Sequence, residues 1–227
     1  HSRVDEAVDL LGELWVAPPA AVPRQRVLRA AVTAVQTVTP AAAPQAWATV
    51  ARWLAEAAED APDSPPVLML RAEFETAREN VSVAESLYRA VLADGHADKP
   101  TQAVAANNLA FQLAAPATAD EAAALIDAAI ATLGPQPDLL DTRGLVRLAQ
   151  GNVAAAIIDL EEACLAPSPA KLMHLAKAYS ARGNTTRAAA TLARARRRMT
   201  ASPRLPGREE SLLEELERDL LPALQRP

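Results

Sequence analysis

The fold is decided by Leu172-x-x-Leu175-Ala176-x-x-Tyr179, which is followed by Ala188-x-x-x-Leu192-x-x-Ala195. Large and small apolar residues recur in both stretches at the spacing of one helix face. The segments upstream repeat the pattern, and their marker alanines are Ala84, Ala122 and Ala156. From Ala84 to Ala188 the marker spacings are 38, 34 and 32 residues. A period of this length, in segments with helical spacing, predicts an array of stacked helical repeats.

Tight turns recur with the same period. Gly151-Asn152 and Gly183-Asn184 lie 32 residues apart, each between two predicted helices. Prolines also fall between the helical segments, and in such positions they do not break the interior of a helix. The 54 Ala, 7 Gly and 18 Pro of the chain fit this arrangement, because Ala suits close helix crossings and Pro suits the turns.

These residues resemble the tetratricopeptide repeat, whose first helix (helix A) carries a large apolar residue, then Leu-Gly or Leu-Ala, then Tyr. Its second helix (helix B) carries Ala, a large residue and Ala again. The resemblance implies an all-α, right-handed superhelix (a solenoid) of antiparallel helix pairs. Two departures stand out: Arg71 and Arg143 occupy the position that usually holds Leu, and only the last repeat has the Tyr.

The repeat register divides the chain into three parts. Degenerate N-terminal helices are expected in residues 3–62, with helices at Arg24–Val38 and Pro44–Glu59; four repeats are expected in 63–199. A capping helix is expected in 207–222, after a loop from Thr200 to Gly207. We expect one solenoid domain, cut from a longer protein, with His1-Ser2 as a cloning remnant.

The last predicted helix, 208–221, is amphipathic. Its apolar stripe is Leu212, Leu213, Leu216, Leu220 and Leu221, and the residues predicted to face water are Glu209, Glu210, Glu214, Glu215 and Glu217. A solenoid needs such a helix to cover its last repeat. A dimerisation or partner-binding helix, allowing self-association, is the alternative.

Catalytic chemistry is not indicated. The histidines and Cys164 lack metal-ligand spacing, and the dispersed glycines form no phosphate-binding or dinucleotide motif. Cys164 is interpreted as a small packed residue. We therefore predict a protein that is not an enzyme and has no cofactor, metal site or catalytic residue.

In the tetratricopeptide-repeat proteins that this chain resembles, helix A lines a concave groove that binds peptides or partner helices. The register maps that groove to Met69, Glu73, Asn107, Phe111, Asp141, Leu145, Met173 and Lys177. The family's clamp for a chaperone's C-terminal carboxylate is absent, because only Asn108 matches it. The acidic pair Asp138 and Asp141 suggests instead a basic or amino-terminal feature on the partner.

The predicted function is a protein-protein interaction scaffold that binds a peptide or partner helix in its groove. The alternatives are a substrate-positioning domain of a larger enzyme, an envelope or exopolysaccharide assembly protein, and a DNA-linked regulator that uses the basic run Arg194–Arg198. The net charge of −5 disfavours nucleic-acid partners, and no membrane contact by this fragment is expected. The 20 Arg against 3 Lys fit a bacterial source. The compartment, cytoplasmic or periplasmic, depends on the missing N-terminus.

Overall fold

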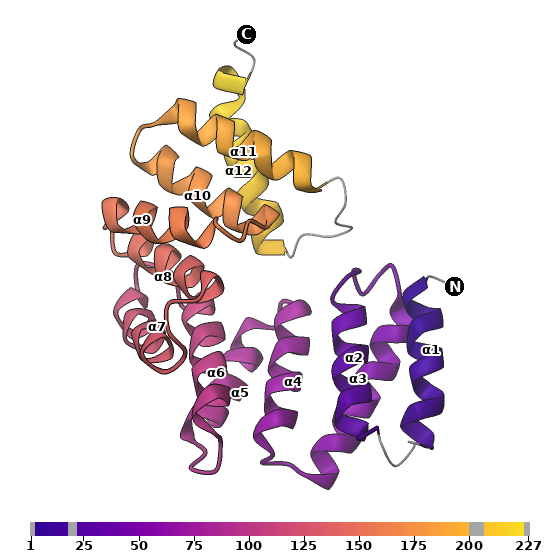
Figure 1. Cartoon of the computed structure of the whole chain (residues 1–227). Helices are drawn as coiled ribbons and strands as arrows, with labels where there is room; N and C mark the ends of the chain where they lie inside the picture. Colours follow the sequence, from indigo (N-terminus) through magenta and orange to yellow (C-terminus); the bar gives the residue numbers. More distant parts are fainter. Residues whose placement is uncertain (1–2, 18–21, 200–206, 225–227) are drawn as a thin grey trace. The chain divides into compact units, whose positions relative to one another are not determined.

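The computed structural model describes residues 3–17, 22–199 and 207–224, with the side chains of 221–224 left out. These residues form twelve helices and no strand (Figure 1). The helices are α1 Arg3–Val16, α2 Arg24–Val35, α3 Pro44–Asp60, α4 Pro65–Ala77, α5 Val81–Ala93, α6 Lys99–Gln112, α7 Ala119–Leu133, α8 Pro137–Ala149, α9 Val153–Ala163, α10 Pro169–Ala181, α11 Thr185–Met199 and α12 Gly207–Leu224. The helices α3, α4, α8 and α10 begin with Pro, whose missing N–H is tolerated at that position.

The chain divides into two compact units, His1–Thr101 and Gln102–Pro227. In unit 1, α1 packs on α2 and α3, α2 and α3 both contact α4, and α4 pairs with α5. All three tryptophans of the chain belong to the core of this unit, together with Phe74. The expectation of one continuous solenoid domain remains a prediction.

In unit 2, consecutive helices pack as pairs. α8 pairs with α9 and α10 with α11; α8 also contacts α7 and α10, and α9 contacts α10. α12 packs on α10 and α11. Its leucines Leu212, Leu216 and Leu220 enter the same apolar cluster as Leu172 and Leu192. Within this unit, α12 therefore covers the last repeat, as a cap does.

The repeat markers lie where the helices cross. The alanines Ala84, Ala122, Ala156 and Ala188 are each 0% exposed. The large residues four positions later are 0–1% exposed, and they are Tyr88, Ile126, Leu160 and Leu192. The predicted alternation of small and large residues is thus confirmed in the packing.

The predicted turns are also found. Gly151 and Gly183 take φ values of +77° and +79°, a region that favours glycine. The Asn152 side chain then accepts a hydrogen bond from Ala155 N. In the first clear repeat the same turn position holds Glu79, with φ +65°.

The arginine in the usual Leu position has a structural explanation. Arg143 donates two hydrogen bonds of 2.8 Å to the carboxylate of Asp159 on α9, and Arg147 contacts the same carboxylate at 2.6 Å. Asp159 is buried, so its charge is compensated by two guanidinium groups. A polar clasp between helices A and B therefore replaces an apolar contact in this repeat.

Predicted and observed boundaries agree closely upstream. The helices predicted to begin at Arg24 and Pro44 do begin there, and they end at Val35 and Asp60. The predicted loop residues 200–206, the expected cloning remnant His1-Ser2 and the side chain of Leu221 lie outside the described residues.

Gly144 lies where α8 comes closest to α9. A Cβ added there would be 2.5 Å from Leu160 Cγ and 2.8 Å from Leu160 Cδ2, and Leu160 is fully buried. We expect Gly144→Ala to lower the free energy of unfolding by about 1 kcal/mol, since overpacking costs ~1–3 kcal/mol and Ala recovers at most ~1 by helix propensity. Denaturant titration followed by circular dichroism measures the change.

Gly12→Ala in α1 is the matched control. Its added Cβ would meet Trp53 at an ordinary 3.6 Å, so we expect a gain of about 0.5–1 kcal/mol from helix propensity. Equal effects of the two substitutions would contradict the close-approach explanation.

Asp159→Ala is expected to destabilise the chain by about 2 kcal/mol. Breaking a buried ion pair costs ~3–5 kcal/mol, but Arg143 and Arg147 are 23% and 28% exposed and can still reach water. The control is Asp127→Ala, which removes a 67% exposed carboxylate 4.0 Å from the same Arg143 and should cost less than about 0.5 kcal/mol. Thermal and denaturant unfolding compare the two; similar losses would refute the clasp.

Candidate functional site

The eight groove positions fall into two groups. Met69 and Glu73 belong to unit 1, on α4; the other six belong to α6, α8 and α10 of unit 2. The buried members are Met69, Asp141, Leu145 and Met173. The members that keep part of their surface exposed are Glu73, Asn107, Phe111 and Lys177. Contact of any of them with a partner remains a prediction.

In unit 1, Glu73 faces the neighbouring helix α2. Arg29 Nη1 lies 3.7 Å from its carboxylate, and Gln36 Nε2 donates to its backbone oxygen at 3.3 Å. Burial raises the pKa of the Glu73 carboxyl, and Arg29 opposes this rise. Glu73 is therefore already engaged within its own unit.

In unit 2, the predicted acidic pair already has cationic or hydrogen-bonding partners. Asp141 lies 2.9 and 3.0 Å from Nδ1 of His174, a buried pair that joins α8 to α10. Asp138 lies 2.6 Å from Lys171 Nζ. In the repeat register, each contact joins helix A of one repeat to helix A of the next. A basic group on a partner would have to compete with these contacts.

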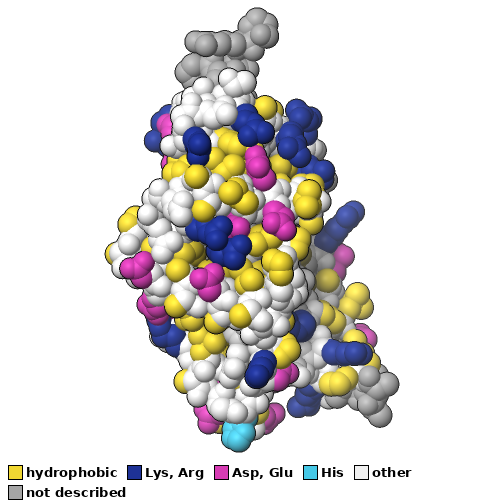
Figure 2. Space-filling model, turned by 60° about the vertical axis from the view of Figure 1, so that its left-hand side comes forward, with side chains coloured by type: hydrophobic (Ala, Val, Ile, Leu, Met, Phe, Trp, Pro, Cys, Tyr) yellow, Lys and Arg dark blue, Asp and Glu magenta, His cyan; other side chains and the backbone are white. Residues whose placement is uncertain are grey.

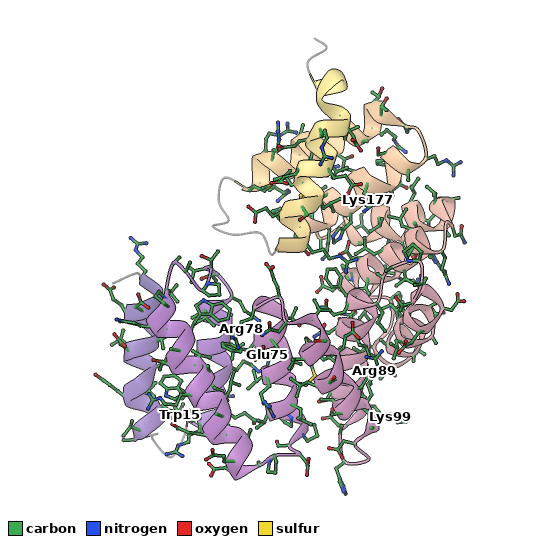
Figure 3. All side chains as sticks on the ribbon, turned by 180° about the vertical axis from the view of Figure 1, so that it is seen from behind. Trp15, Glu75, Arg78, Arg89, Lys99 and Lys177 are labelled. Atoms are coloured by element: carbon green, nitrogen blue, oxygen red, sulfur yellow. The ribbon has the colours of Figure 1, made fainter. Side chains whose placement is uncertain are left out.

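The groove positions on α10 lie against α12. Met173 is fully buried in a cluster with Leu212 and Leu216, and the ammonium of Lys177 is 3.8 Å from the Glu215 carboxylate (Figure 3). The cap thus covers part of the helix-A face of its own unit.

The first turn of α12 reaches further, to the C-terminal end of α6. Arg208 donates from Nη1 to the backbone oxygen of Phe111 at 2.6 Å and from Nη2 to that of Ala114 at 3.2 Å. Its guanidinium carbon lies 4.8 Å from the centroid of the Phe111 ring, and that ring is 6.3 Å from the ring of His174. Phe111, His174 and Arg208 therefore form one cluster from three helices.

Glu209, the next residue, does not face water as the amphipathic pattern predicted. It is 7% exposed, and its Oε2 is buried with no hydrogen-bond partner among the described residues. Burial raises the pKa of its carboxyl and Asp141 adds to the rise, while the Glu209 backbone N–H, His174 and Arg208 oppose it. The prediction for Glu209 was wrong because this turn packs on the helix-A face.

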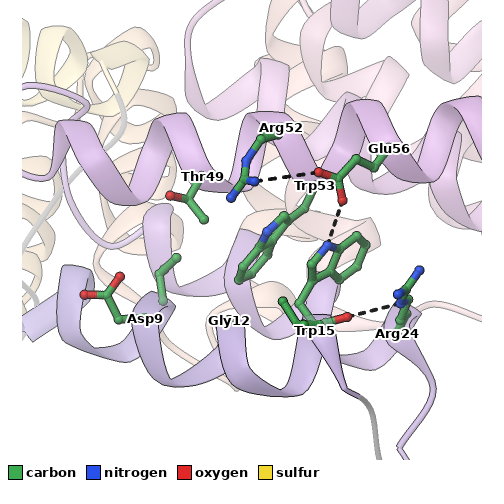
Figure 4. Close-up of a pocket in the computed structure, with 10 residues that line it drawn as sticks. Asp9, Gly12, Trp15, Arg24, Thr49, Arg52, Trp53 and Glu56 are labelled. Carbon is green, nitrogen blue, oxygen red and sulfur yellow. Dashed lines mark hydrogen bonds and ion pairs between the residues drawn. The ribbon is translucent and has the colours of Figure 1, made fainter.

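Unit 1 contains a separate pocket of about 470 Å³ beside α1 and α3 (Figure 4). Trp15 and Trp53 stack in it with ring centroids 5.2 Å apart. The Trp15 indole donates to Glu56 at 2.8 Å, and Arg24 lies over the Trp15 ring and donates to its backbone oxygen. Its polar groups thus bond mostly to one another, and both indoles are nearly buried.

Cys164 and the basic run Arg194–Arg198 were the remaining candidates for chemistry or charge recognition. Cys164 is half-buried and packs on the unit 2 core; burial, the largest cause, raises the pKa of its thiol to about 11, so it stays protonated at neutral pH. Arg196 of the basic run pairs with Glu217 of α12. On the face shown in Figure 2, basic and acidic side chains are interspersed among apolar ones.

Metal-binding clusters and membrane-spanning helices are both absent from the described part of the chain. In it, no group of three or more His, Cys, Asp or Glu side chains is placed to hold a metal ion. No described helix is long and apolar enough to cross a membrane.

Sequence reasoning missed Arg208, Glu209 and the Trp15 pocket. The only available signal for the pocket was the placement of all three tryptophans within the first 53 residues. For Arg208 and Glu209 no local signal existed, because their contacts join residues up to 97 positions apart.

No protein-family model and no curated protein matches the chain. Solved structures do match it. A chain of the APC/C hetero-tetramer Cut9-Hcn1 aligns with TM-score 0.68 and 15% identity, over 99% of this chain and 46% of that one. BtubC (BKLC) from P. vanneervenii aligns with TM-score 0.60 and 18% identity, over 87% and 89% of the two chains. A thermophilic TPR protein of Thermus thermophilus, TTC0263, aligns with TM-score 0.60 and 19% identity, over 86% and 97%.

At such identities these likenesses show the fold alone. The chain has the all-α tetratricopeptide-repeat solenoid fold, which the repeat pattern and the resemblance predicted.

Glu209→Gln is expected to stabilise the chain at neutral pH by about 1 kcal/mol, because a buried charged oxygen without a partner costs about that much. The folded-state pKa of Glu209 lies above its ordinary 4.5, so protonation favours the folded state as the pH falls. The advantage of the variant should therefore be largest above the raised pKa and vanish below about pH 4.5.

Melting temperatures measured from pH 4 to 8 test this difference. Glu214→Gln, which changes an exposed residue of the same helix, should show no such trend. A pH-independent difference for Glu209→Gln would contradict the burial argument.

Proposed function

We propose that the protein is a non-enzymatic interaction scaffold that holds a peptide or a partner helix on the helix-A face of unit 2. The tetratricopeptide-repeat fold supports this proposal, because stacked helix pairs present an extended surface suited to a chain-like ligand. One of the similar solved structures, Cut9-Hcn1, is a hetero-tetramer.

The observation that carries the proposal is the partial exposure of Asn107, Phe111 and Lys177 at helix-A positions. The neighbouring repeat markers, in contrast, are fully buried. These side chains offer an amide, an aromatic ring and a cation to the backbone and side chains of a peptide. Arg208 lies over the ring and Glu215 lies 3.8 Å from the cation, so a peptide that uses these two groups competes with contacts of α12. The Asn107 Oδ1 is buried and has no hydrogen-bond partner among the described residues, and its Nδ2 donates to Asn108 Oδ1 at 3.2 Å.

Unit 1 is the less suitable candidate for the same role. Its helix-A position Glu73 is already bonded to α2. In its tryptophan pocket, Trp15 likewise already donates to Glu56 and accepts from Arg24. The proposal therefore places the ligand on unit 2.

The test selects peptides from a displayed random library against the full chain and measures their affinities by fluorescence anisotropy. Asn107→Ala and Phe111→Ala should each weaken the selected peptides by about tenfold, or about 1.4 kcal/mol. Ile158→Ala, which truncates an apolar side chain 64% exposed on the helix-B row, should leave the affinities unchanged.

Two results would overturn the proposal. One is a library that yields no binder to the folded chain. The other is a set of binders that ignore Asn107→Ala and Phe111→Ala. Circular dichroism of each variant keeps loss of binding separate from loss of folding.

A further inference from the structure

The C-terminal end of α6 has the chemistry of a guanidinium receptor. The last carbonyls of a helix lack intrahelical partners and carry the negative end of the helix dipole. Here the backbone oxygen of Phe111, in the last turn of α6, and that of Ala114, two residues after the helix ends, accept two hydrogen bonds from one guanidinium. The Phe111 oxygen also accepts from Ala114 N at 3.4 Å, and the Phe111 ring lies 4.8 Å from the guanidinium carbon. Two oriented acceptors and an aromatic face favour a planar cation with several donors.

This receptor is filled within the chain by Arg208, but the turn that brings Arg208 also brings Glu209. The carboxylate of Glu209 is buried, and one of its oxygens lacks a partner among the described residues. This burial raises the pKa of the carboxyl, with a smaller contribution from Asp141, against the opposing effects of the backbone N–H, His174 and Arg208. Burial lowers the pKa of the Arg208 guanidinium and Glu209 opposes this, but the guanidinium has two hydrogen-bond acceptors. The adjacent carboxylate has an oxygen with no such partner, which is costly at neutral pH.

We propose that the α6 terminus is an arginine-recognition site, which Arg208 occupies in the free protein and an arginine of a bound peptide occupies in the complex. The inference rests on the proposed function, because it specifies the chemistry of the peptide that unit 2 binds. The first turn of α12 then acts as an internal competitor of the partner.

Release of this turn leaves the cap in place. Leu212, Leu216 and Leu220 hold α12 on α10 and α11, and Arg208 precedes all of them. The competitor is tethered, so its effective concentration is on the order of millimolar. The apparent affinity for a partner is the intrinsic affinity multiplied by the fraction of chains in which the site is free of Arg208.

Arginine is the residue that fits, and lysine is not an equivalent. Nη1 and Nη2 of one guanidinium reach two different carbonyl oxygens while its carbon lies over the Phe111 ring. A lysine ammonium is a point charge that cannot reproduce this fork. Replacement of the peptide arginine by lysine should therefore weaken binding, although the charge is kept.

The experiment selects displayed random peptides on three versions of the 227-residue chain: the parent, Arg208→Ala and the double variant Arg208→Ala/Phe111→Ala. We expect binders of the Arg208→Ala chain to share an arginine and to bind the parent about tenfold more weakly. They should also lose about tenfold when that arginine becomes lysine. Arg218→Ala, an exposed arginine of the same helix, is the matched control and should behave as the parent.

The outcomes separate the two proposals. Peptides that depend on Asn107 but share no arginine, or that bind the parent and Arg208→Ala equally, would overturn the arginine site and leave the scaffold proposal standing. Absence of any binder to the parent and to Arg208→Ala would overturn both. Equal binding to the double variant would also overturn the site, since Phe111 would then contribute nothing.

Discussion

The approach of helix A to helix B at small residues is the constraint on which the other features depend. At Gly144 there is no room for even a Cβ beside Leu160, and the four marker alanines are fully buried. Helices that pack this closely leave little apolar volume to fill, which explains how a chain with 3% aromatic residues still forms continuous cores. The spacing of small residues along the sequence is therefore the most informative part of the chain.

That constraint explains which features were predictable from the sequence. Periodicity is a local property, so it located the repeats, their turns at Gly151 and Gly183, and the starts of α2 and α3. The departure at Arg143 was visible as an anomaly, but its resolution needed Asp159, a residue of the next helix. A pattern can reveal a misfit at one position, whereas the compensating partner depends on how the helices pack.

The candidate site shows the same limit more strongly. The repeat register correctly assigned Asn107 and Phe111 to helix A, but it contained no information on what would lie against them. Arg208 follows Phe111 by 97 positions, and residues 200–206 between α11 and α12 carry no repeat pattern that fixes where α12 begins. The register also did not predict the contact of Met173 with the cap, because the cap is not part of the repeat.

The first turn of α12 and the leucines that follow it are held by different kinds of contact. Its leucines are buried in the unit 2 cluster, an interaction that grows with apolar area and needs no exact partner. Its first turn depends on one guanidinium, two carbonyl oxygens and a ring, and it also carries a buried carboxylate with an unpaired oxygen. The contact of the first turn is directional and is coupled to a desolvated charge, so at neutral pH it is weaker than the apolar contact of the leucines. Local opening of α12 should therefore begin at Arg208 and Glu209, where it exposes the helix-A face without uncovering the core.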